Sequence, residues 1–338
     1  MHNIALLLAL GCFQPSDRDF DDDDDLGFFP DPGGTDSDTA GGDDTGGDGG
    51  GDGGDDGGGD GGDDTSSGDP IQDLCVRYHQ GLANQSEGSW NGNVNSCDAG
   101  DVSDTMVDNA LAILNTYRWL ADLPPVTANA AKNVAAQECA LMMHAAGSLS
   151  HSPSTSWPCY TSTGAGAAGT SNIAPAPGVS AMDMYFVDWG NATTMGHRRW
   201  FLSNSLGPIG LGSTSGFSCA TVLYGSGNAT KQFTAWPPRG MVPYRAISTP
   251  QGSMDSTGWT VQSDSVRLTG AEVSITSGGV NMPVTVTELL ANYGSTYAIS
   301  IHPSGWTTTR GATYEVEVRG SSETISYEVE VVDCDPYD

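Results

Sequence analysis

Apolar residues recur at helical spacing in two segments between residues 103 and 146. The first can be capped by Ser103 or Asp104 and ends before Pro124-Pro125. The second runs from about Ala128 to Ala146, with Gly147 as its stop. Its buried stripe is predicted to be Val134, Ala135, Leu141 and Met142. Residues 181–189 predict a short third helix, whereas 71–100 and 164–169 read as irregular loops.

From residue 266 onward the pattern changes to alternation with a period of two, after a proline-rich connector at 236–250. Runs of this kind, each bounded by Gly, Asn, Ser or Pro, predict a β-sandwich of immunoglobulin-like type. The alternating positions are Val266/Leu268, Val273/Ile275, Val284/Val286, Tyr297/Ile299/Ile301, Tyr314/Val316/Val318 and Ile325/Tyr327/Val329/Val331. Two further strands are expected at 208–212 and 220–225.

The amino-terminal end carries a short apolar run, Ile4 to Leu10, with the length of a signal-peptide core. The following Leu10-Gly11-Cys12 resembles a bacterial lipobox, which implies cleavage before Cys12 and acylation of its thiol. We therefore expect a signal peptide and lipobox at 1–12 and a lipoprotein at the outer face of a bacterial envelope. A simple cleaved signal or a misassigned start remain alternatives.

Residues 13–70 are rich in Asp and Gly and hold most of the formal net charge of −30. They lack the apolar area that would offset the entropy of ordering, so we expect a disordered tether. Only 12 Lys and Arg occur in the chain, which excludes the basic stripe that nucleic-acid binding needs. Contact with an anionic membrane is disfavoured by the same repulsion unless the attachment is covalent, through Cys12.

The chain has seven cysteines, and six remain if Cys12 is acylated. No Cys-x-x-Cys pair and no zinc-finger spacing occurs, so disulfides in an oxidising compartment are the better interpretation. Local pairing predicts Cys75–Cys97 and Cys139–Cys159, which leaves Cys219 for Cys334.

Polar motifs interrupt the apolar pattern of residues 103–226 in a characteristic order. They are Leu114-Asn115-Thr116-Tyr117-Arg118, Ser150-His151, Thr170-Ser171-Asn172-Ile173-Ala174 and Gly196-His197-Arg198. In this order they resemble the CAP superfamily of cysteine-rich secretory, antigen 5 and pathogenesis-related-1 proteins. The resemblance implies an α+β chain: a CAP-type α-β-α sandwich over 71–235, followed by the β-sandwich of 236–338.

The resemblance also implies a cleft in which two histidines and two acids can hold a divalent metal. His151 and His197 match the histidines, and Ser171 replaces the first acid. Asp188 is the expected second acid, with Asp183 a less favoured candidate. Two imidazoles and one carboxylate suffice for weak zinc binding with water as fourth ligand. The alternative is that the histidines only bond neighbouring loops.

Other side chains near these motifs have plainer interpretations. Of Arg198 and Arg199, one is expected to pair with an acid such as Asp188 or Glu138 while the other faces solvent. Trp200 and Phe201 are expected in the core.

Serines surround His151, but no Gly-x-Ser-x-Gly elbow occurs and the cysteines are expected to be paired. The first hypothesis is therefore a non-catalytic extracellular module that binds lipid, another small ligand or a surface partner. A metal-dependent, peptidase-like hydrolase acting outside the cell is the second.

Overall fold

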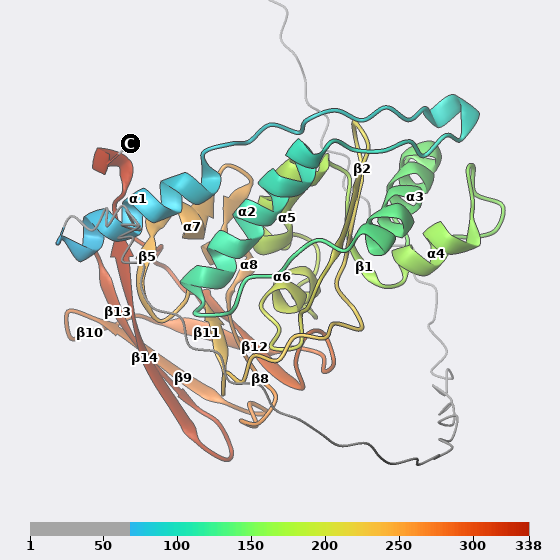
Figure 1. The fold of residues 1–338 in the computed structure, drawn as a ribbon. Helices are drawn as coiled ribbons and strands as arrows, with labels where there is room; N and C mark the ends of the chain where they lie inside the picture. Colours follow the sequence, from blue (N-terminus) through green and yellow to red (C-terminus); the bar gives the residue numbers. More distant parts are fainter. Residues whose placement is uncertain (1–67, 338) are drawn as a thin grey trace, which may run out of the picture. The chain divides into compact units, whose positions relative to one another are not determined.

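The structure is a computed structural model that describes residues 68–337, and its fold is α+β as predicted (Figure 1). The expected signal peptide and lipobox lie outside the described residues, as does the acidic linker up to residue 67. The helices of the described part are α1 (Pro70–Leu82), η1 (Val94–Ser96), α2 (Asp104–Leu120), α3 (Ala130–Ala146), α4 (Ser162–Ala168), α5 (Gly178–Val187), α6 (Gly196–Phe201), α7 (Tyr244–Ile247), α8 (Met254–Thr257) and η2 (Asp335–Tyr337). Within residues 68–337, none of the helices is long and apolar enough to cross a membrane.

In the first part of the described chain, helices cover both faces of a small antiparallel sheet. The sheet has the order β1-β3-β2, from β1 (Ser171–Ala174), β3 (Ser218–Thr221) and β2 (Gly210–Ser213). Helices α3 and α4 pack on one side, and α5 with α2 behind it covers the other (Figure 1). This is the α-β-α arrangement expected from the sequence, and the predicted helices at 103–124, 128–146 and 181–189 are confirmed.

Helix α3 packs closely on the sheet through small residues. Ala136 and Ala140 are fully buried, and a Cβ added to Gly212 of β2 would lie 2.2 Å from the backbone carbon of Ala136. Only glycine at 212 permits this approach. Leu141 and Met142 are buried as predicted. Val134 is 58% exposed, because the face of α3 that packs on the sheet carries Ala136 and Ala140 instead.

Two segments expected to be irregular are helical. In α1, Asp69 caps the helix by accepting a hydrogen bond from Ile71 N at 3.0 Å, and Pro70 stands at its first turn. In α4, Thr161 accepts from Gly164 N at 2.9 Å. In both cases an N-terminal cap and tertiary packing stabilise the helix, although some of its residues have low helix propensity.

The rest of the chain forms a β-rich region of two larger sheets and a small hairpin. One sheet has the order β10-β9-β13-β14-β5 and the other β11-β12-β8-β4. The strands are β4 (Thr234–Trp236), β5 (Gly240–Pro243), β6 (Ser248–Thr249), β7 (Gly252–Ser253), β8 (Trp259–Ser263), β9 (Glu272–Ser277), β10 (Val280–Asn281), β11 (Val284–Glu288), β12 (Tyr297–Pro303), β13 (Thr313–Arg319) and β14 (Thr324–Val332).

The alternating runs from residue 273 onward are confirmed as strands. The run at 266–268 is not a strand, because Ser263 Oγ accepts hydrogen bonds from the amides of Ser265 and Val266 and turns the chain out of β8. Strand β8 is not among the predicted strands, although Trp259 and Val261 alternate with Thr260 and Gln262, and all five of its residues are buried.

The cysteine pairing differs from the prediction. Within the described residues the six cysteines form three disulfides: Cys75–Cys334, Cys97–Cys159 and Cys139–Cys219. The local pairing is wrong because Cys75 lies on the buried face of α1 against the end of the β-rich region, rather than in a loop beside Cys97. Cys139 of α3 likewise faces β3, which carries Cys219.

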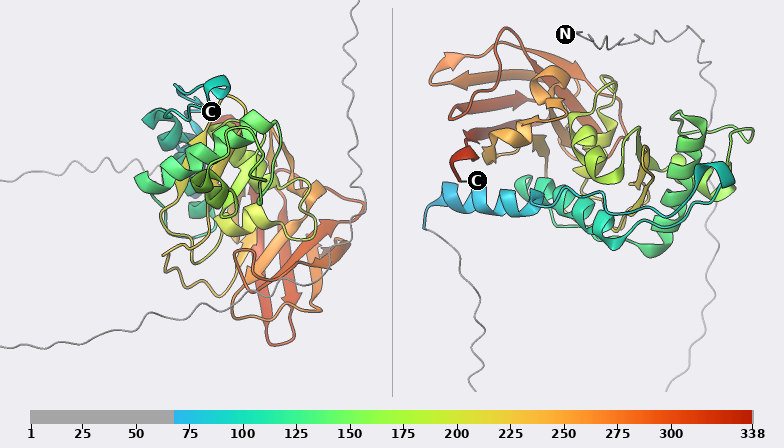
Figure 2. Two further views of the ribbon diagram at one scale, coloured as in Figure 1. Left: turned by 90° about the vertical axis from the view of Figure 1, so that its right-hand side faces the viewer. Right: turned by 90° about the horizontal axis from the view of Figure 1, so that it is seen from above.

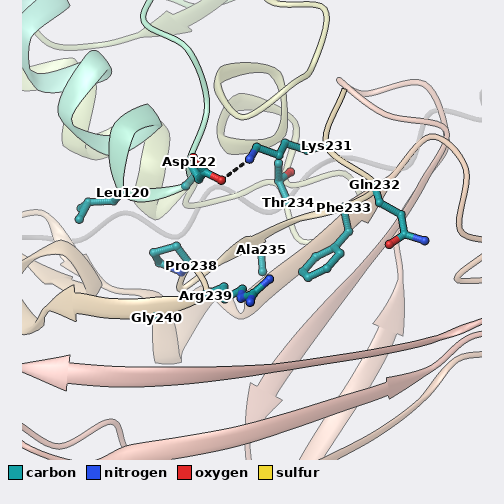
Figure 3. Close-up of a pocket in the computed structure, with 11 residues that line it drawn as sticks. Leu120, Asp122, Lys231, Gln232, Phe233, Thr234, Ala235, Pro238, Arg239 and Gly240 are labelled. Atoms are coloured by element: carbon teal, nitrogen blue, oxygen red, sulfur yellow. Dashed lines mark hydrogen bonds and ion pairs between the residues drawn. The ribbon is translucent and has the colours of Figure 1, made fainter. Parts of the chain in front are cut away.

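Figure 2 shows the layered first part and the β-rich region in direct contact, and one hydrophobic core contains residues of both. The predicted division near residue 235 stays a prediction. Beside this position lies a pocket of about 590 Å³, between the end of α2 and residues 231–240 (Figure 3).

Candidate functional site

Asp188 and His197 are brought together by the ends of two helices. Asp188 follows α5 in a left-handed conformation, with φ of 62°, and this turns the chain back so that α6 can begin at Gly196. The His197 Nδ1 lies 2.9 Å from Asp188 Oδ1. The backbone turn at Asp188 and the start of α6 at Gly196 therefore place the two side chains next to each other.

Besides His197, Asp188 contacts two hydrogen-bond donors in its own segment. Its Oδ1 also accepts from Asn191 Nδ2 at 2.6 Å, and its Oδ2 accepts from the amide of Arg198 at 3.2 Å. The carboxylate is 1% exposed, so these donors replace the water that it loses. Asp188 consequently holds the 188–198 loop in shape.

His197 presents one nitrogen for other chemistry. His197 Nδ1 lies between Asp188 Oδ1 and the side-chain amide of Asn191, whose Nδ2 is 3.0 Å away. Since a carboxylate only accepts hydrogen bonds and an amide NH2 group only donates them, Nδ1 is a donor in one tautomer, toward Asp188, and an acceptor in the other, from Asn191. Nε2 makes no hydrogen bond among the described residues, and the side chain keeps 20% of its surface exposed. With the proton on Nδ1, the ring can accept a hydrogen bond, take a proton or bind a metal through Nε2.

The back of His197 is supported by a buried tyrosine and an asparagine of β1. The ring of Tyr185 meets it edge-on at 5.2 Å between centroids. Asn172 Nδ2 donates to the carbonyl oxygen of His197 at 3.1 Å, and Tyr185 donates to the carbonyl oxygen of Asn172 at 3.2 Å. Burial raises the pKa of Tyr185 far above its usual value, so its hydroxyl remains a donor.

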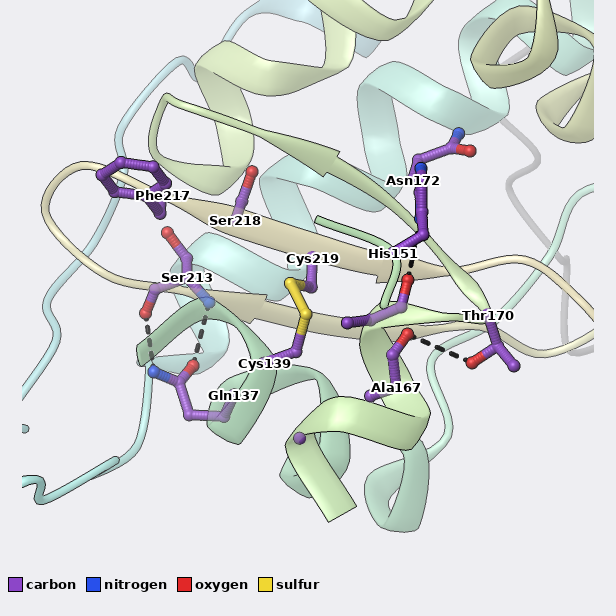
Figure 4. The surroundings of a disulfide bond; sticks show 12 residues. Gln137, Cys139, His151, Ala167, Thr170, Asn172, Ser213, Phe217, Ser218 and Cys219 are labelled. Atoms are coloured by element: carbon purple, nitrogen blue, oxygen red, sulfur yellow. Dashed lines mark hydrogen bonds between the residues drawn. A yellow bond between two sulfur atoms is a disulfide. The ribbon is translucent and has the colours of Figure 1, made fainter. Parts of the chain in front are cut away.

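His151 lies on the exposed turn after α3 and is held through its own Nδ1. That nitrogen is 2.9 Å from the carbonyl oxygen of Ala168, which can only accept, so Nε2 of His151 is the free acceptor (Figure 4). The contact fixes the Ser150-His151 turn against α4. No hydrogen bond or ion pair of the described residues joins His151 to Asp188 or to His197.

Ser171 and Asp183 complete the set of residues considered from the sequence. Ser171 is buried in β1, and its Oγ has no hydrogen-bond partner among the described residues. Asp183 accepts a hydrogen bond from Tyr117 Oη at 2.5 Å, and burial raises its pKa. Within residues 68–337 no group of three or more His, Cys, Asp or Glu side chains is placed to hold a metal.

The prediction for the two arginines after His197 is wrong, because both are buried and both bond to carbonyl oxygens. Arg198 donates to the carbonyl oxygens of Phe186 and Val187, at 2.5 and 3.1 Å, and to Gly258, at 2.7 Å. Burial lowers the pKa of Arg198 to about 10, an effect that the nearby charge of Asp188 opposes.

Arg199 binds the loop between β11 and β12. It donates to the carbonyl oxygens of Leu290, at 2.7 Å, and Ser295, at 3.1 Å. Burial lowers its pKa to about 10 as well. The two arginines thus connect α6 to the β-rich region. The expectation for Trp200 and Phe201 is confirmed, since both pack in the core.

Three exposed apolar side chains lie on the segments that surround His197. Trp189 follows Asp188 and is 56% exposed, while Leu290 and Tyr293 of the β11–β12 loop are 57% and 38% exposed. The loop is held against this site: the amide of Leu290 donates to the carbonyl oxygen of Thr193 at 2.9 Å, and a Cβ at Gly196 would lie 3.0 Å from the Tyr293 ring. This grouping leaves no signal in the sequence, since the loop lies almost a hundred residues from His197.

Comparison with known proteins supports the resemblance. Residues 111–224 match the model of the CAP family, described as the cysteine-rich secretory protein family. This segment contains all four motifs together with Asp188 and stops before the β-rich region. Searches of curated proteins and of solved structures found no match. A CAP domain of unspecified function, with three disulfides in the described part, indicates an extracellular or secreted protein.

Proposed function

We propose that this protein is a surface-anchored CAP-domain module that binds a lipid or another small ligand with an apolar part, without transforming it. The observation that carries the proposal is the placement of Trp189, Leu290 and Tyr293 on the segments around His197. Exposed aromatic and aliphatic side chains beside a half-buried polar group are the usual composition of a small-molecule site.

The side chains of this surface are held before any ligand arrives. Trp189 donates from Nε1 to the carbonyl oxygen of Gln251 at 3.1 Å, and Asp188 fixes the ring of His197. Pre-positioned groups lose less entropy on binding. We expect the apolar part of a ligand to cover Trp189 or Tyr293, and a hydroxyl or amide of the ligand to donate to His197 Nε2.

A hydrolase is the second candidate, and the Asp188–His197 pair is the observation that favours it. A carboxylate beside Nδ1 with Nε2 unbonded is the arrangement of a general base in the tautomer in which Nδ1 donates to Asp188 rather than accepting from Asn191. A nucleophile is the missing partner: among the described residues, neither ring nitrogen of His197 bonds to a hydroxyl or thiol. Catalysis would then depend on a water molecule or a metal.

Metal binding at His151, Asp188 and His197 stays a prediction. The Nδ1 atoms of both histidines are occupied, so an ion would have to use their Nε2 atoms and would compete for Asp188 with its hydrogen bonds. We therefore expect only weak zinc binding.

We further propose that lipid on Cys12 anchors the protein in a bacterial outer membrane. The acidic segment 13–70 would act as a spacer that keeps the CAP domain clear of the cell surface.

Screening the full chain against lipids and peptides, with and without chelator, tests the two candidates. We expect saturable lipid binding that falls in Trp189→Ala and Tyr293→Ala and persists in Val134→Ala, which removes an exposed apolar side chain from α3. Peptide turnover that is lost in Asp188→Asn or on chelation would instead favour the hydrolase.

A further inference from the structure

The pocket between the end of α2 and residues 231–240 has the size and lining of a ligand site. Its volume is about 590 Å³, within the range of roughly 300 to 1,000 Å³ that holds small molecules in proteins. Its apolar walls are Leu120, Phe233, Ala235 and Pro238. None of these residues belongs to the His197 site.

Two parts of the lining, Lys231 and Phe233, are held by contacts outside the pocket. The side chain of Asn204 makes two hydrogen bonds to the backbone of Lys231. It donates to the carbonyl oxygen at 2.8 Å and accepts from the amide at 3.1 Å. The ring of Phe233 packs against that of Tyr327, with centroids 5.7 Å apart. The pocket is therefore a feature of the fold rather than of one side-chain rotamer.

The charge of the lining is opposite to that of the chain. Two of the 12 basic residues, Lys231 and Arg239, line this pocket in a protein with a formal net charge of −30. Asp122 is the one acid in the lining, and its carboxylate pairs with the ammonium of Lys231 (Figure 3).

The guanidinium of Arg239 is exposed, and among the described residues it makes no ion pair and no hydrogen bond. Its free N–H groups suit a carboxylate or a similar oxyanion. One unpaired cation beside an apolar wall favours a ligand with a single negative group and an apolar body.

We propose that this pocket binds a small amphiphilic carboxylate, with the charged end on Arg239 and the apolar part against Phe233, Pro238 and Leu120. Asp122 competes with the ligand for Lys231, because its carboxylate already pairs with this second cation of the pocket. The proposal is independent of the His197 site and of the function proposed for it.

Titration calorimetry of the full chain with octanoate tests this proposal. Octanoate should bind more tightly than acetate, which lacks the apolar part, and than 1-octanol, which lacks the charge. Arg239→Gln should weaken octanoate binding about 3- to 10-fold, in the range of charge-assisted contacts at a pocket rim.

The variant Asp122→Asn should tighten octanoate binding a few-fold, because it releases Lys231. Asn tolerates the left-handed backbone of this residue, which has φ of 55°, so the fold should be preserved. Arg319→Gln, which removes an exposed arginine paired with Glu317, is the control and should change nothing.

No heat with octanoate in the wild type, or equal affinities in Arg239→Gln, Asp122→Asn and the wild type, would overturn the proposal. Trp189→Ala and His197→Gln separate the two sites. Octanoate binding that is lost in these variants and kept in Arg239→Gln would assign the ligand to the His197 surface and refute its assignment here.

Discussion

Arg198 Nη1 donates a hydrogen bond to the carbonyl oxygen of Gly258 at 2.7 Å and so joins α6 to the residue that precedes β8. Its guanidinium is fully buried and bonds to carbonyl and hydroxyl oxygens and a methionine sulfur. The Gly196-His197-Arg198 motif therefore supplies both His197 and a connection between the layered first part and the β-rich region.

We expect Arg198→Lys to lower the free energy of unfolding by about 2–4 kcal/mol, because lysine keeps a buried charge but leaves several carbonyl oxygens without donors. Urea titration measures the change. Arg319→Lys is the matched control, with an exposed side chain and an expected change below about 0.5 kcal/mol. A loss in Arg198→Lys no larger than in the control would contradict the structural role of this residue.

A helix or strand can be predicted from the sequence where its local residue pattern matches its burial in the folded protein. Helix α3 is found because Asn129 and Gly147 cap it and its apolar residues recur at helical spacing. Helix α1 is missed because its buried residues, such as Leu74 and Tyr78, lie in a polar segment next to the acidic linker. Strand β8 is missed although its apolar residues alternate, because only two of its five residues, Trp259 and Val261, are apolar and the run is short.

The candidate site likewise has one part that depends on local sequence and another that depends on distant segments. Asp188 and His197 lie 2.9 Å apart and belong to one short segment, so their proximity depends on local structure. The contacts of Arg198 and Arg199, and the position of Tyr293, depend on how the β-rich region packs against α6. Such contacts between distant segments leave no periodic or motif signal, and a basic pair near an acid is equally consistent with a surface ion pair.

The disulfide Cys75–Cys334 should stabilise the protein more than Cys97–Cys159. It closes a sequence separation of 259 residues against 62, which corresponds to about 1.3 kcal/mol in the chain-entropy description. Both sulfurs of the first pair are also buried. Urea titration of the two double Cys→Ala variants measures the difference, after non-reducing peptide mapping of the wild type. Equal losses, or a mapped Cys75–Cys97 bond, would contradict this prediction.

Asp183→Asn should stabilise the protein at neutral pH. Burial raises the pKa of Asp183, so the folded state binds its proton more readily than the unfolded state, and stability from this group falls as pH rises through the folded pKa. Each unit by which the pKa is raised corresponds to about 1.4 kcal/mol. Asparagine removes the charge and still accepts the hydrogen bond from Tyr117.

Urea titrations of Asp183→Asn between pH 3 and pH 7 follow this effect. The advantage of the variant should be largest at pH 7 and should shrink as Asp183 of the wild type becomes protonated in acid. Glu288→Gln, at an exposed residue of β11, provides the control. An advantage that does not depend on pH would show that the charge of Asp183 is not its origin.

Cys12→Ser tests the proposed anchor. If Cys12 carries lipid, the wild type should incorporate labelled fatty acid and partition with membranes, whereas the variant should lose the label and be released or remain unprocessed. Metabolic labelling and fractionation of cells measure both. A variant that fractionates and is processed like the wild type would exclude the anchor at this residue.

Zinc titration tests the expected metal site at His151, Asp188 and His197. Weak binding is expected, because Ser171 supplies no anionic ligand, so Asp188 is the one carboxylate of the expected set, and affinity falls as ligand charge is removed. Binding should weaken as the pH falls through the range in which imidazole is protonated, since only the neutral ring can ligate. His197→Ala should abolish it, and Ser171→Glu should strengthen it by adding an anionic ligand. Since Ser171 is buried, circular dichroism must first show that Ser171→Glu folds. Negligible heats in the wild type, His197→Ala and a folded Ser171→Glu alike would leave His151 and His197 as residues that only hold their loops in place.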